Sequence, residues 1–112
     1  VRIAGMNCWL RSRWLLLLIL LAGFAQAEEP ATKLIAKYNC LGCHAVDQRI
    51  VGPSYKEVAA RYRNQKDAEA LLMKEIRSGV QGKWDLKYKV AMPPQQIGDN
   101  DLRVIVRWIL AQ

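Results

Sequence analysis

The segment Cys40-Leu41-Gly42-Cys43-His44 places two thiols three positions apart, with an imidazole directly after the second thiol. Thiols at this spacing can form thioether bonds to the two vinyl groups of a haem, and the adjacent imidazole can bind the iron. His44 is the only histidine among the 112 residues. The segment therefore predicts one covalently attached c-type haem, held through Cys40 and Cys43, with His44 as an axial ligand.

Other uses of the two thiols stay open at this point. A zinc site would need two more thiolate or imidazole ligands, and Cys8 is the only such residue left in the chain. A redox-active dithiol of the thioredoxin type would need a preceding strand within a βαβ unit, and no strand-like alternation lies near the pair. The thiols could also be structural. Haem attachment fits the segment better than any of the three.

The first 27 residues have the pattern of an export signal. Three arginines precede or border the apolar run WLLLLILLAGF at residues 14–24, and the small residues of AQA at 25–27 are typical of a cleavage site. The apolar run is shorter than the roughly 20 residues that span a bilayer. We therefore expect residues 1–27 to be a signal peptide that is removed on export to the periplasm, and the alternative is an uncleaved anchor.

Removal of residues 1–27 from the 112-residue chain would leave 85 residues, enough for one small domain at 28–112. Cys8 would be lost with the signal. The whole chain has a net charge of +7, and because three of its 17 basic residues but none of its 10 acidic ones precede residue 28, the exported part would carry +4. This modest charge suits docking on an acidic protein patch, and it lacks the dense Lys/Arg clusters of a nucleic-acid-binding protein.

Apolar residues recur at helical spacing through residues 28–112, which predicts an all-α, single-domain fold. About four helices are expected, with a long irregular loop at residues 79–98 before the last one. Each has a recognisable start or end: the first begins at Pro30, the second opens with the capping-box pair Ser54 and Glu57, the third is capped by Asp67 and closed by Ser78-Gly79, and the last follows Asp99.

The loop contains a second candidate ligand in the sequence Ala91-Met92-Pro93-Pro94. A thioether sulfur is a soft ligand, and a methionine opposite a histidine raises the reduction potential of haem iron. Pro93 favours an extended backbone at Met92 and stiffens this part of the loop. Met73 lies in the middle of a predicted helix, where we expect it to fill the core. Met92 is therefore the predicted second axial ligand.

From about Glu28 to Gln112 the chain resembles the small bacterial class I cytochromes c of the c-551/c-552 group. The resemblance rests on five segments of the sequence: Cys40-x-x-Cys43-His44, Val51-Gly52-Pro53-x-Tyr55-Lys56-x-Val58-Ala59, Gly82-x-Trp84, Met92-Pro93-Pro94 and Trp108-Ile109-Leu110. It implies the class I cytochrome c fold, in which the helices wrap around one covalently attached haem.

The resemblance also implies roles for single residues. The carbonyl of Pro53 would accept a hydrogen bond from the ring of His44 and fix its tautomer, although turn geometry alone could explain the proline. The indole N–H of Trp84 would donate to a haem propionate, or its ring could simply pack on the core. Trp108 would pack the last helix across the first.

Two departures from the family's pattern stand out. Gln95 follows the proline pair where the family usually has asparagine, whose amide can donate to the methionine sulfur. The stretch from Trp84 to Met92 is also longer than in typical members, with Lys87-Tyr88-Lys89 inserted. The first departure leaves a donor to the sulfur unassigned, and the second leaves the path of the loop open.

Two strong axial ligands leave no open position on the iron, which predicts a periplasmic one-electron carrier and not an enzyme. We expect a monomer without stable membrane insertion after signal cleavage. Its partners would be redox proteins with acidic docking patches, such as a terminal oxidase, a nitrite reductase or peroxidase, and an upstream cytochrome complex. Lys83, Lys87 and Lys89 would steer such partners, or would only solvate the loop.

Two other functions remain possible from the sequence. If Met92 is not bound to the iron, a five-coordinate haem c could act as a gas sensor or as a peroxidase-like enzyme. A haem-free Cys-x-x-Cys interaction module is the third possibility.

Overall fold

A computed structural model describes residues 28–112, so the signal peptide predicted for residues 1–27 lies outside the described residues. The described part contains four α-helices and one short 3-10 turn: α2 (Glu28–Lys37), η1 (Cys40–Gly42), α3 (Tyr55–Tyr62), α4 (Ala68–Ser78) and α5 (Asp99–Leu110). Apart from two isolated β-bridges, this part of the chain has no strand pairing. The predicted all-α fold with about four helices is confirmed.

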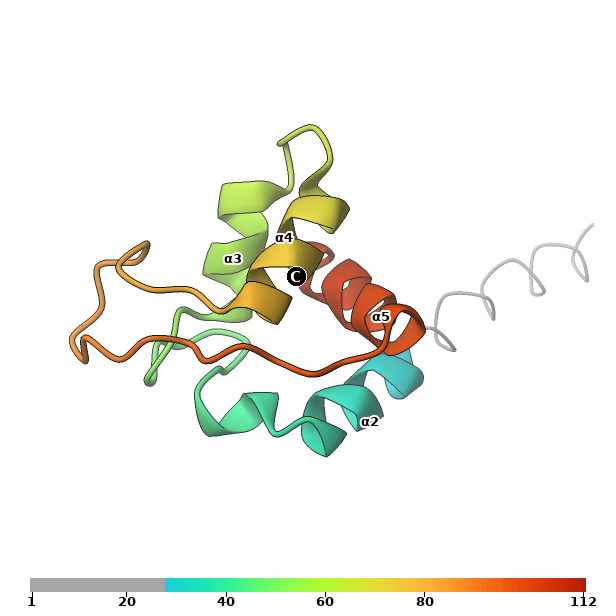
Figure 1. The fold of residues 1–112 in the computed structure, drawn as a ribbon, viewed down its shortest axis with the longest axis horizontal. Coiled ribbons are helices and arrows are strands. Elements are labelled where there is room, and N and C mark those ends of the chain that lie inside the picture. Colours follow the sequence, from blue (N-terminus) through green and yellow to red (C-terminus); the bar gives the residue numbers. More distant parts are fainter. Residues whose placement is uncertain (1–27) are drawn as a thin grey trace, which may run out of the picture. The chain divides into compact units, whose positions relative to one another are not determined.

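Helix α5 packs against both α3 and α4 (Figure 1), and Ala31–Gln112 form one compact unit. The buried residues of α5 recur at spacings of three and four, which places them on a single apolar face; they are Leu102, Ile105, Val106 and Ile109. The end of α2 is tied to α5 because the hydroxyl of Tyr38 donates a hydrogen bond of 2.7 Å to Asp101. Ile35 of α2 joins the same core.

The start of α3 is fixed by the predicted capping box. The Ser54 hydroxyl accepts a hydrogen bond from the backbone N–H of Glu57 (3.2 Å), and the Glu57 carboxylate accepts one from the backbone N–H of Ser54 (3.0 Å). Two N–H groups that the first turn leaves without helical partners are thereby satisfied. The prediction for this helix start is confirmed.

The start of α4 differs from its prediction. Asp67 precedes Ala68 as expected, but its backbone is left-handed (φ 61°), and its side chain makes no capping hydrogen bond. Capping by a carboxylate requires an extended backbone at the capping residue, so the predicted role of Asp67 is wrong. The end of the helix follows the prediction, because Gly79 adopts φ 79° directly after Ser78.

Residues 79–98 form an irregular loop that returns the chain from α4 to α5, drawn in orange in Figure 1. Near its start and end the loop is closed by an antiparallel bridge between Val80 and Met92, with N–O distances of 3.0 and 2.8 Å. Within residues 28–112, none of the helices has both the length and the hydrophobicity needed to cross a bilayer.

Candidate functional site

One cavity of about 550 Å³ brings together all the residues that the sequence singled out for cofactor binding. Helices α3, α4 and α5 contribute apolar side chains to its lining, η1 contributes a thiol, and the loop 79–98 supplies a further wall. The six predicted site residues all line this cavity: Cys40, Cys43, His44, Pro53, Trp84 and Met92.

The two thiols lie at the beginning and just past the end of η1. Neither forms a disulfide, and Cys40 is partly buried whereas Cys43 is exposed. Backbone hydrogen bonds from the N–H groups of Cys43 and His44 to the carbonyl of Cys40 (3.2 and 3.0 Å) close this turn. Burial raises the pKa of the Cys40 thiol, so the thiol stays protonated at neutral pH. Both sulfur atoms are therefore free to form bonds with a ligand in the cavity.

The imidazole of His44 is held from three sides. Its Nδ1 donates a hydrogen bond to the carbonyl oxygen of Pro53 at 2.7 Å, so that in the neutral imidazole Nε2 is the nitrogen that can bind a metal. The ring of Tyr55 stacks on it, with centroids 5.5 Å apart and planes 25° apart. Gly52 lies so close that a Cβ added there would be 2.5 Å from Cε1 of the ring.

Tyr55 also connects the imidazole to the last helix. Its ring meets the ring of Trp108 edge-on, with centroids 5.1 Å apart. Burial raises the pKa of the Tyr55 hydroxyl above its ordinary value, so this residue is neutral behind His44. Trp108 was predicted to pack α5 across the first helix. In the structure its ring contacts Tyr55, the first residue of α3.

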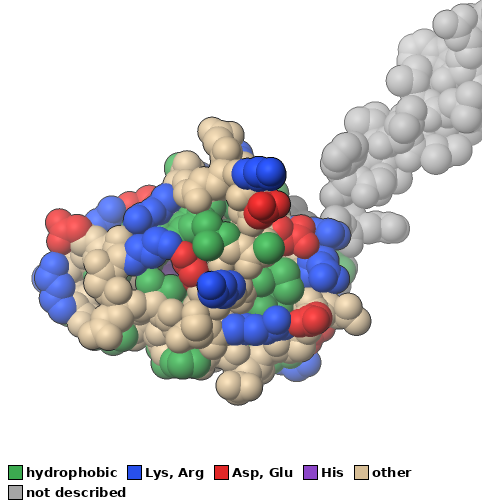
Figure 2. All heavy atoms as spheres, turned by 45° about the horizontal axis from the view of Figure 1, so that its top comes forward, with side chains coloured by type: hydrophobic (Ala, Val, Ile, Leu, Met, Phe, Trp, Pro, Cys, Tyr) green, Lys and Arg blue, Asp and Glu red, His purple; other side chains and the backbone are tan. Residues whose placement is uncertain are grey.

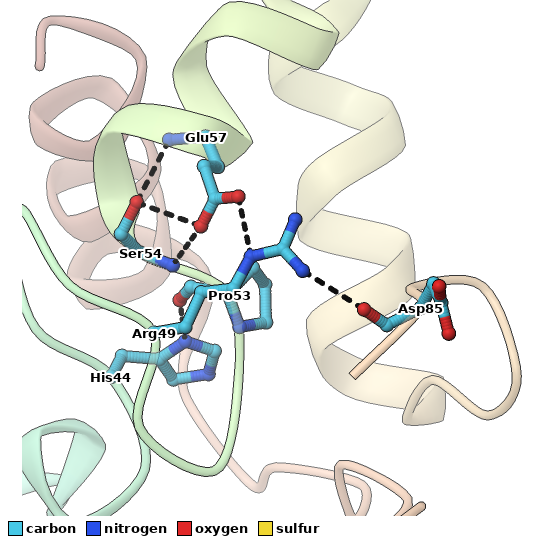
Figure 3. A network of polar contacts seen from close by, with 6 residues as sticks. All are labelled: His44, Arg49, Pro53, Ser54, Glu57 and Asp85. Atoms are coloured by element: carbon cyan, nitrogen blue, oxygen red, sulfur yellow. Dashed lines mark hydrogen bonds and ion pairs between the residues drawn. The ribbon is translucent and has the colours of Figure 1, made fainter. Parts of the chain in front are cut away.

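A polar network supports the loop that follows His44 (Figure 3). Arg49 donates through Nε to Glu57 Oε1 (2.6 Å) and through a terminal nitrogen to the backbone carbonyl of Asp85 (2.9 Å). Glu57 is the capping-box residue of α3, and Asp85 belongs to the loop that carries Met92. The guanidinium of Arg49 therefore connects three segments: the loop next to His44, the start of α3 and the loop 79–98.

Met92 is positioned mainly through its backbone. Both hydrogen bonds of its bridge go to Val80, the second residue after the end of α4. A Cβ on Gly79 would lie 2.7 Å from the carbonyl oxygen of Met92, so a residue with a side chain could not occupy this position without displacing the backbone of the loop at Met92. The side-chain amide of Gln95 donates to the carbonyl of Pro93 at 2.8 Å. Gln95 thus stabilises the proline pair in this structure.

Trp84 is half-buried in the cavity wall, and the guanidinium carbon of Arg61 lies 4.5 Å from the centroid of its ring. Arg61 also donates to the carbonyl of Lys83 at 3.0 Å. These contacts show how the ring is held.

The three loop lysines differ in their surroundings. The ammonium of Lys83 contacts Glu75, and that of Lys89 lies 3.0 Å from Asp85, whereas that of Lys87 lies 5.3 Å from the centroid of the Tyr88 ring. Basic and acidic side chains are interspersed over the face drawn in Figure 2.

The residues of this cavity suit a haem c. A macrocycle needs apolar walls, two thiols at the spacing of its vinyl groups, and a nitrogen ligand whose orientation is fixed. The cavity offers all three, with the thiols of Cys40 and Cys43 and the Nε2 of His44, and Met92 is also among its lining residues.

Sequence reasoning missed several residues that support the site. Gly52 was named only as part of the segment Val51-Gly52-Pro53, although the close approach of its backbone to His44 requires a glycine. Arg49 gave no signal, because its partner Asp85 lies 36 positions away. Glu75 was not among the candidate residues, yet it lines the cavity.

The known proteins that this chain resembles in sequence and in structure are cytochromes c. Residues 29–112 match the family described as Cytochrome c. The chain is 41% identical to cytochrome c-551 of Pseudomonas aeruginosa over 93 residues, covering 83% of this chain and 86% of that protein. It is 38% identical to cytochrome c-552 of Nitrosomonas europaea, covering 82% and 84%. A crystal structure of a deletion mutant of Nitrosomonas europaea cytochrome c552 superimposes with a TM-score of 0.66 at 36% identity, covering 71% of this chain and 96% of that one.

Proposed function

Because the chain belongs to the cytochrome c family and so carries one haem c attached through Cys40 and Cys43, we propose that it is a periplasmic electron carrier with His44 and Met92 as axial ligands. Haem c supplies a one-electron couple between ferric and ferrous iron. The residues of this chain determine whether that couple serves electron transfer or substrate chemistry.

The observation that carries the proposal is the arrangement of His44 and Met92 in one cavity. The bond of 2.7 Å from Nδ1 of His44 to the carbonyl of Pro53 fixes the tautomer in which Nε2 is the free donor and makes this nitrogen more basic. The bridge to Val80 holds Met92 in the wall contributed by the loop 79–98. With both positions taken by protein ligands, no open position is left for dioxygen or peroxide.

The apolar lining supports the same function. Apolar side chains of α3, α4 and α5 line the cavity and would keep water from a haem bound there, so that few polar groups would reorient when the charge of the centre changes. Low reorganisation favours rapid outer-sphere transfer, in which the electron passes through an exposed edge of the group. We propose that Trp84, whose ring Arg61 covers at 4.5 Å, donates its indole N–H to a propionate on one side of this cavity.

Partner docking is proposed to depend on Lys87 and Lys89. Lys89 is 77% exposed and its partner Asp85 is fully exposed, so their ion pair is screened by water and competes weakly with an acidic protein surface. Lys83 was included in the sequence-based steering hypothesis, but its ammonium contacts Glu75 in the cavity wall. We therefore leave Lys83 out of the docking surface.

An optical spectrum of the holoprotein tests the axial ligands. We expect a methionine-to-iron charge-transfer band in the ferric protein and no spectral change when carbon monoxide is added to the ferrous protein. The variant M92A should lose the band and bind carbon monoxide, whereas M73A, in which the altered methionine lies in α4 against the core, should keep the wild-type spectrum. If wild-type protein binds carbon monoxide readily, the five-coordinate sensor or peroxidase-like function takes the place of the carrier.

The periplasmic location and the removal of residues 1–27 are part of the same proposal. They rest on the export signal in the sequence and can be tested by mass spectrometry of the protein isolated from a periplasmic fraction. A polypeptide that begins at Glu28 and carries the added mass of one haem is the expected result. A haem-bearing polypeptide that retains residues 1–27 in the membrane fraction would instead show an uncleaved anchor.

A further inference from the structure

Two charged side chains interrupt the otherwise uncharged lining of the cavity. Among its lining residues within 28–112, Glu75 is the one carboxylate, and Lys83 is the one residue with an ammonium or guanidinium group. Glu75 lies on α4 and Lys83 on the following loop. A charge in such surroundings acts through a lower effective dielectric than a charge on the surface, so both residues are placed to influence a redox centre in the cavity.

Each oxygen of the Glu75 carboxylate has its own donor. The ammonium of Lys83 contacts Oε1, and the hydroxyl of Tyr62 donates to Oε2 at 2.7 Å. The Glu75 side chain is 17% exposed and that of Lys83 is 33% exposed. Backbone anchoring limits the freedom of the lysine, since Arg61 donates to the Lys83 carbonyl at 3.0 Å. The pair is therefore a defined part of the cavity wall.

The raised pKa values of Lys83 and Tyr62 keep both donors to Glu75 protonated at neutral pH. The hydrogen bond to Glu75, followed by the one to Tyr62, raises the pKa of Lys83, so the lysine stays protonated. Burial is the largest cause of the raised pKa of Tyr62, which keeps this hydroxyl protonated and able to donate.

Opposite charges at one site have opposite effects on a one-electron couple. A carboxylate favours the more positive ferric state, whereas an ammonium favours the ferrous state. In a contact pair the two effects largely cancel.

We propose that Glu75 and Lys83 form a charge-compensated pair in which each charge offsets the effect of the other on the reduction potential of the haem centre, with Tyr62 as the residue that orients the carboxylate. The inference rests on the haem c of the family and adds to the carrier function a pair of charges in the cavity wall to which its potential is sensitive. It also accounts for the position of Lys83, which lines the cavity and whose ammonium contacts Glu75.

Spectroelectrochemical titration of the holoprotein at fixed pH and ionic strength tests the pair. We expect E75Q to increase the ferrous-to-ferric ratio at a fixed applied potential by about threefold to tenfold, and K83Q to decrease it by a similar factor. A tenfold change corresponds to about 59 mV for a one-electron couple. The double variant E75Q/K83Q should return to within about twofold of the wild type, because both charges are then absent.

Two variants on α4 serve as matched controls. E69Q removes a carboxylate that lies on the surface between Arg103 (3.1 Å) and Arg107 (2.9 Å), and K74Q removes an exposed ammonium next to Glu75 in the sequence. Neither residue lines the cavity. Both controls should change the ratio by less than about twofold, and raising the salt concentration should diminish even this change.

The signs of the shifts decide between an electrostatic and a structural role. A merely structural pair would give shifts of the same sign in E75Q and K83Q, because either variant would loosen the cavity and admit water. Shifts of the same sign, or shifts no larger than those of E69Q and K74Q, overturn the proposal. If E75Q does not accumulate as holoprotein, K83Q compared with K74Q still decides it, because only K83Q should lower the ratio.

Failure of this inference and failure of the carrier proposal would be distinguishable. If Met92 is not a ligand, the wild-type protein lacks the charge-transfer band whatever the potentials of the variants. If the charge-transfer band is present and the reduction potentials of E75Q and K83Q equal that of the wild type, only the role of Glu75 and Lys83 is refuted.

Discussion

Replacement of Gly52 by alanine should destabilise the protein and displace the proposed ligand His44. The added Cβ would lie 2.5 Å from Cε1, 2.9 Å from Nδ1 and 3.1 Å from Nε2 of the imidazole. Ordinary contact begins at 3.4 Å, so the ring would have to withdraw by about 0.9 Å. The backbone cannot easily retreat, because the Gly52 N–H donates to the carbonyl of Cys43 at 2.8 Å.

The magnitude follows from two contributions. Overpacking of a well-packed site costs about 1–3 kcal/mol. Withdrawal of the ring also lengthens the hydrogen bond to Pro53, and loss of a hydrogen bond costs about 0.5–1.5 kcal/mol. We therefore expect G52A to lower the free energy of unfolding by about 2–4 kcal/mol, which for a domain of this size corresponds to a fall of at least 8 °C or so in Tm.

Denaturant unfolding of the ferric holoprotein measures the stability change, and the charge-transfer band reports the iron coordination in the same sample. G98A is the matched control, because a Cβ at Gly98 meets no atom within 4 Å. Its free energy of unfolding should stay within about 1 kcal/mol of the wild type. If G52A is as stable as G98A and keeps the wild-type spectrum, the steric reasoning about His44 is wrong.

Three further changes have expected outcomes that follow from the contacts described. S54A removes the capping box of α3 and should lower the free energy of unfolding by about 1 kcal/mol in urea titrations, whereas an effect below about 0.3 kcal/mol would show that the cap is dispensable. The hydrogen bond from Tyr38, followed by that from Lys37, holds the pKa of Asp101 below its ordinary value of 3.8. The ionised carboxylate of Asp101 therefore stabilises the folded protein above pH 3.8, and this stabilisation is lost as the pH falls through the folded-state pKa. Y38F should therefore lose less stability than the wild type between pH 5 and pH 3, and equal losses would contradict the assignment. G79A places a Cβ 2.7 Å from the Met92 carbonyl at a residue with φ 79°, so it should weaken the charge-transfer band and lower the Tm together, and an unchanged band would show that the bridge to Val80 does not position the sulfur.

Those features that depend on near neighbours in the sequence were predictable. The capping box at Ser54 and the glycine end of α4 involve residues at most three positions apart, and their local geometry is dictated by the backbone groups that each helix end leaves without partners. The six residues predicted for the site also line one cavity, because the thiols and His44 are adjacent in sequence and the apolar helices pack around them. Their roles as ligands and donors remain predictions.

Features that depend on tertiary contacts were not predictable. Asp67 has the residue type of a helix cap, but its backbone is left-handed and its side chain makes no capping hydrogen bond. Lys83 was read as a docking residue, and only the fold shows that Glu75 lies within reach of its ammonium. The link from Arg49 to Asp85 joins two irregular loops, for which periodicity gives no information. In each case a contact between distant or irregular segments decides the outcome.

The bridge between Val80 and Met92 determines how the cavity wall formed by the loop 79–98 can open. Both amides of the bridge are engaged, and Val80 follows the last turn of α4 almost directly, so unwinding of that turn releases both hydrogen bonds at once. Amide hydrogen exchange of Val80 and Met92 should therefore proceed through one shared sub-global opening with a single free energy. Transient release of the thioether would then be governed by fraying at the end of α4, a local event that leaves the packing of α3 against α5 intact.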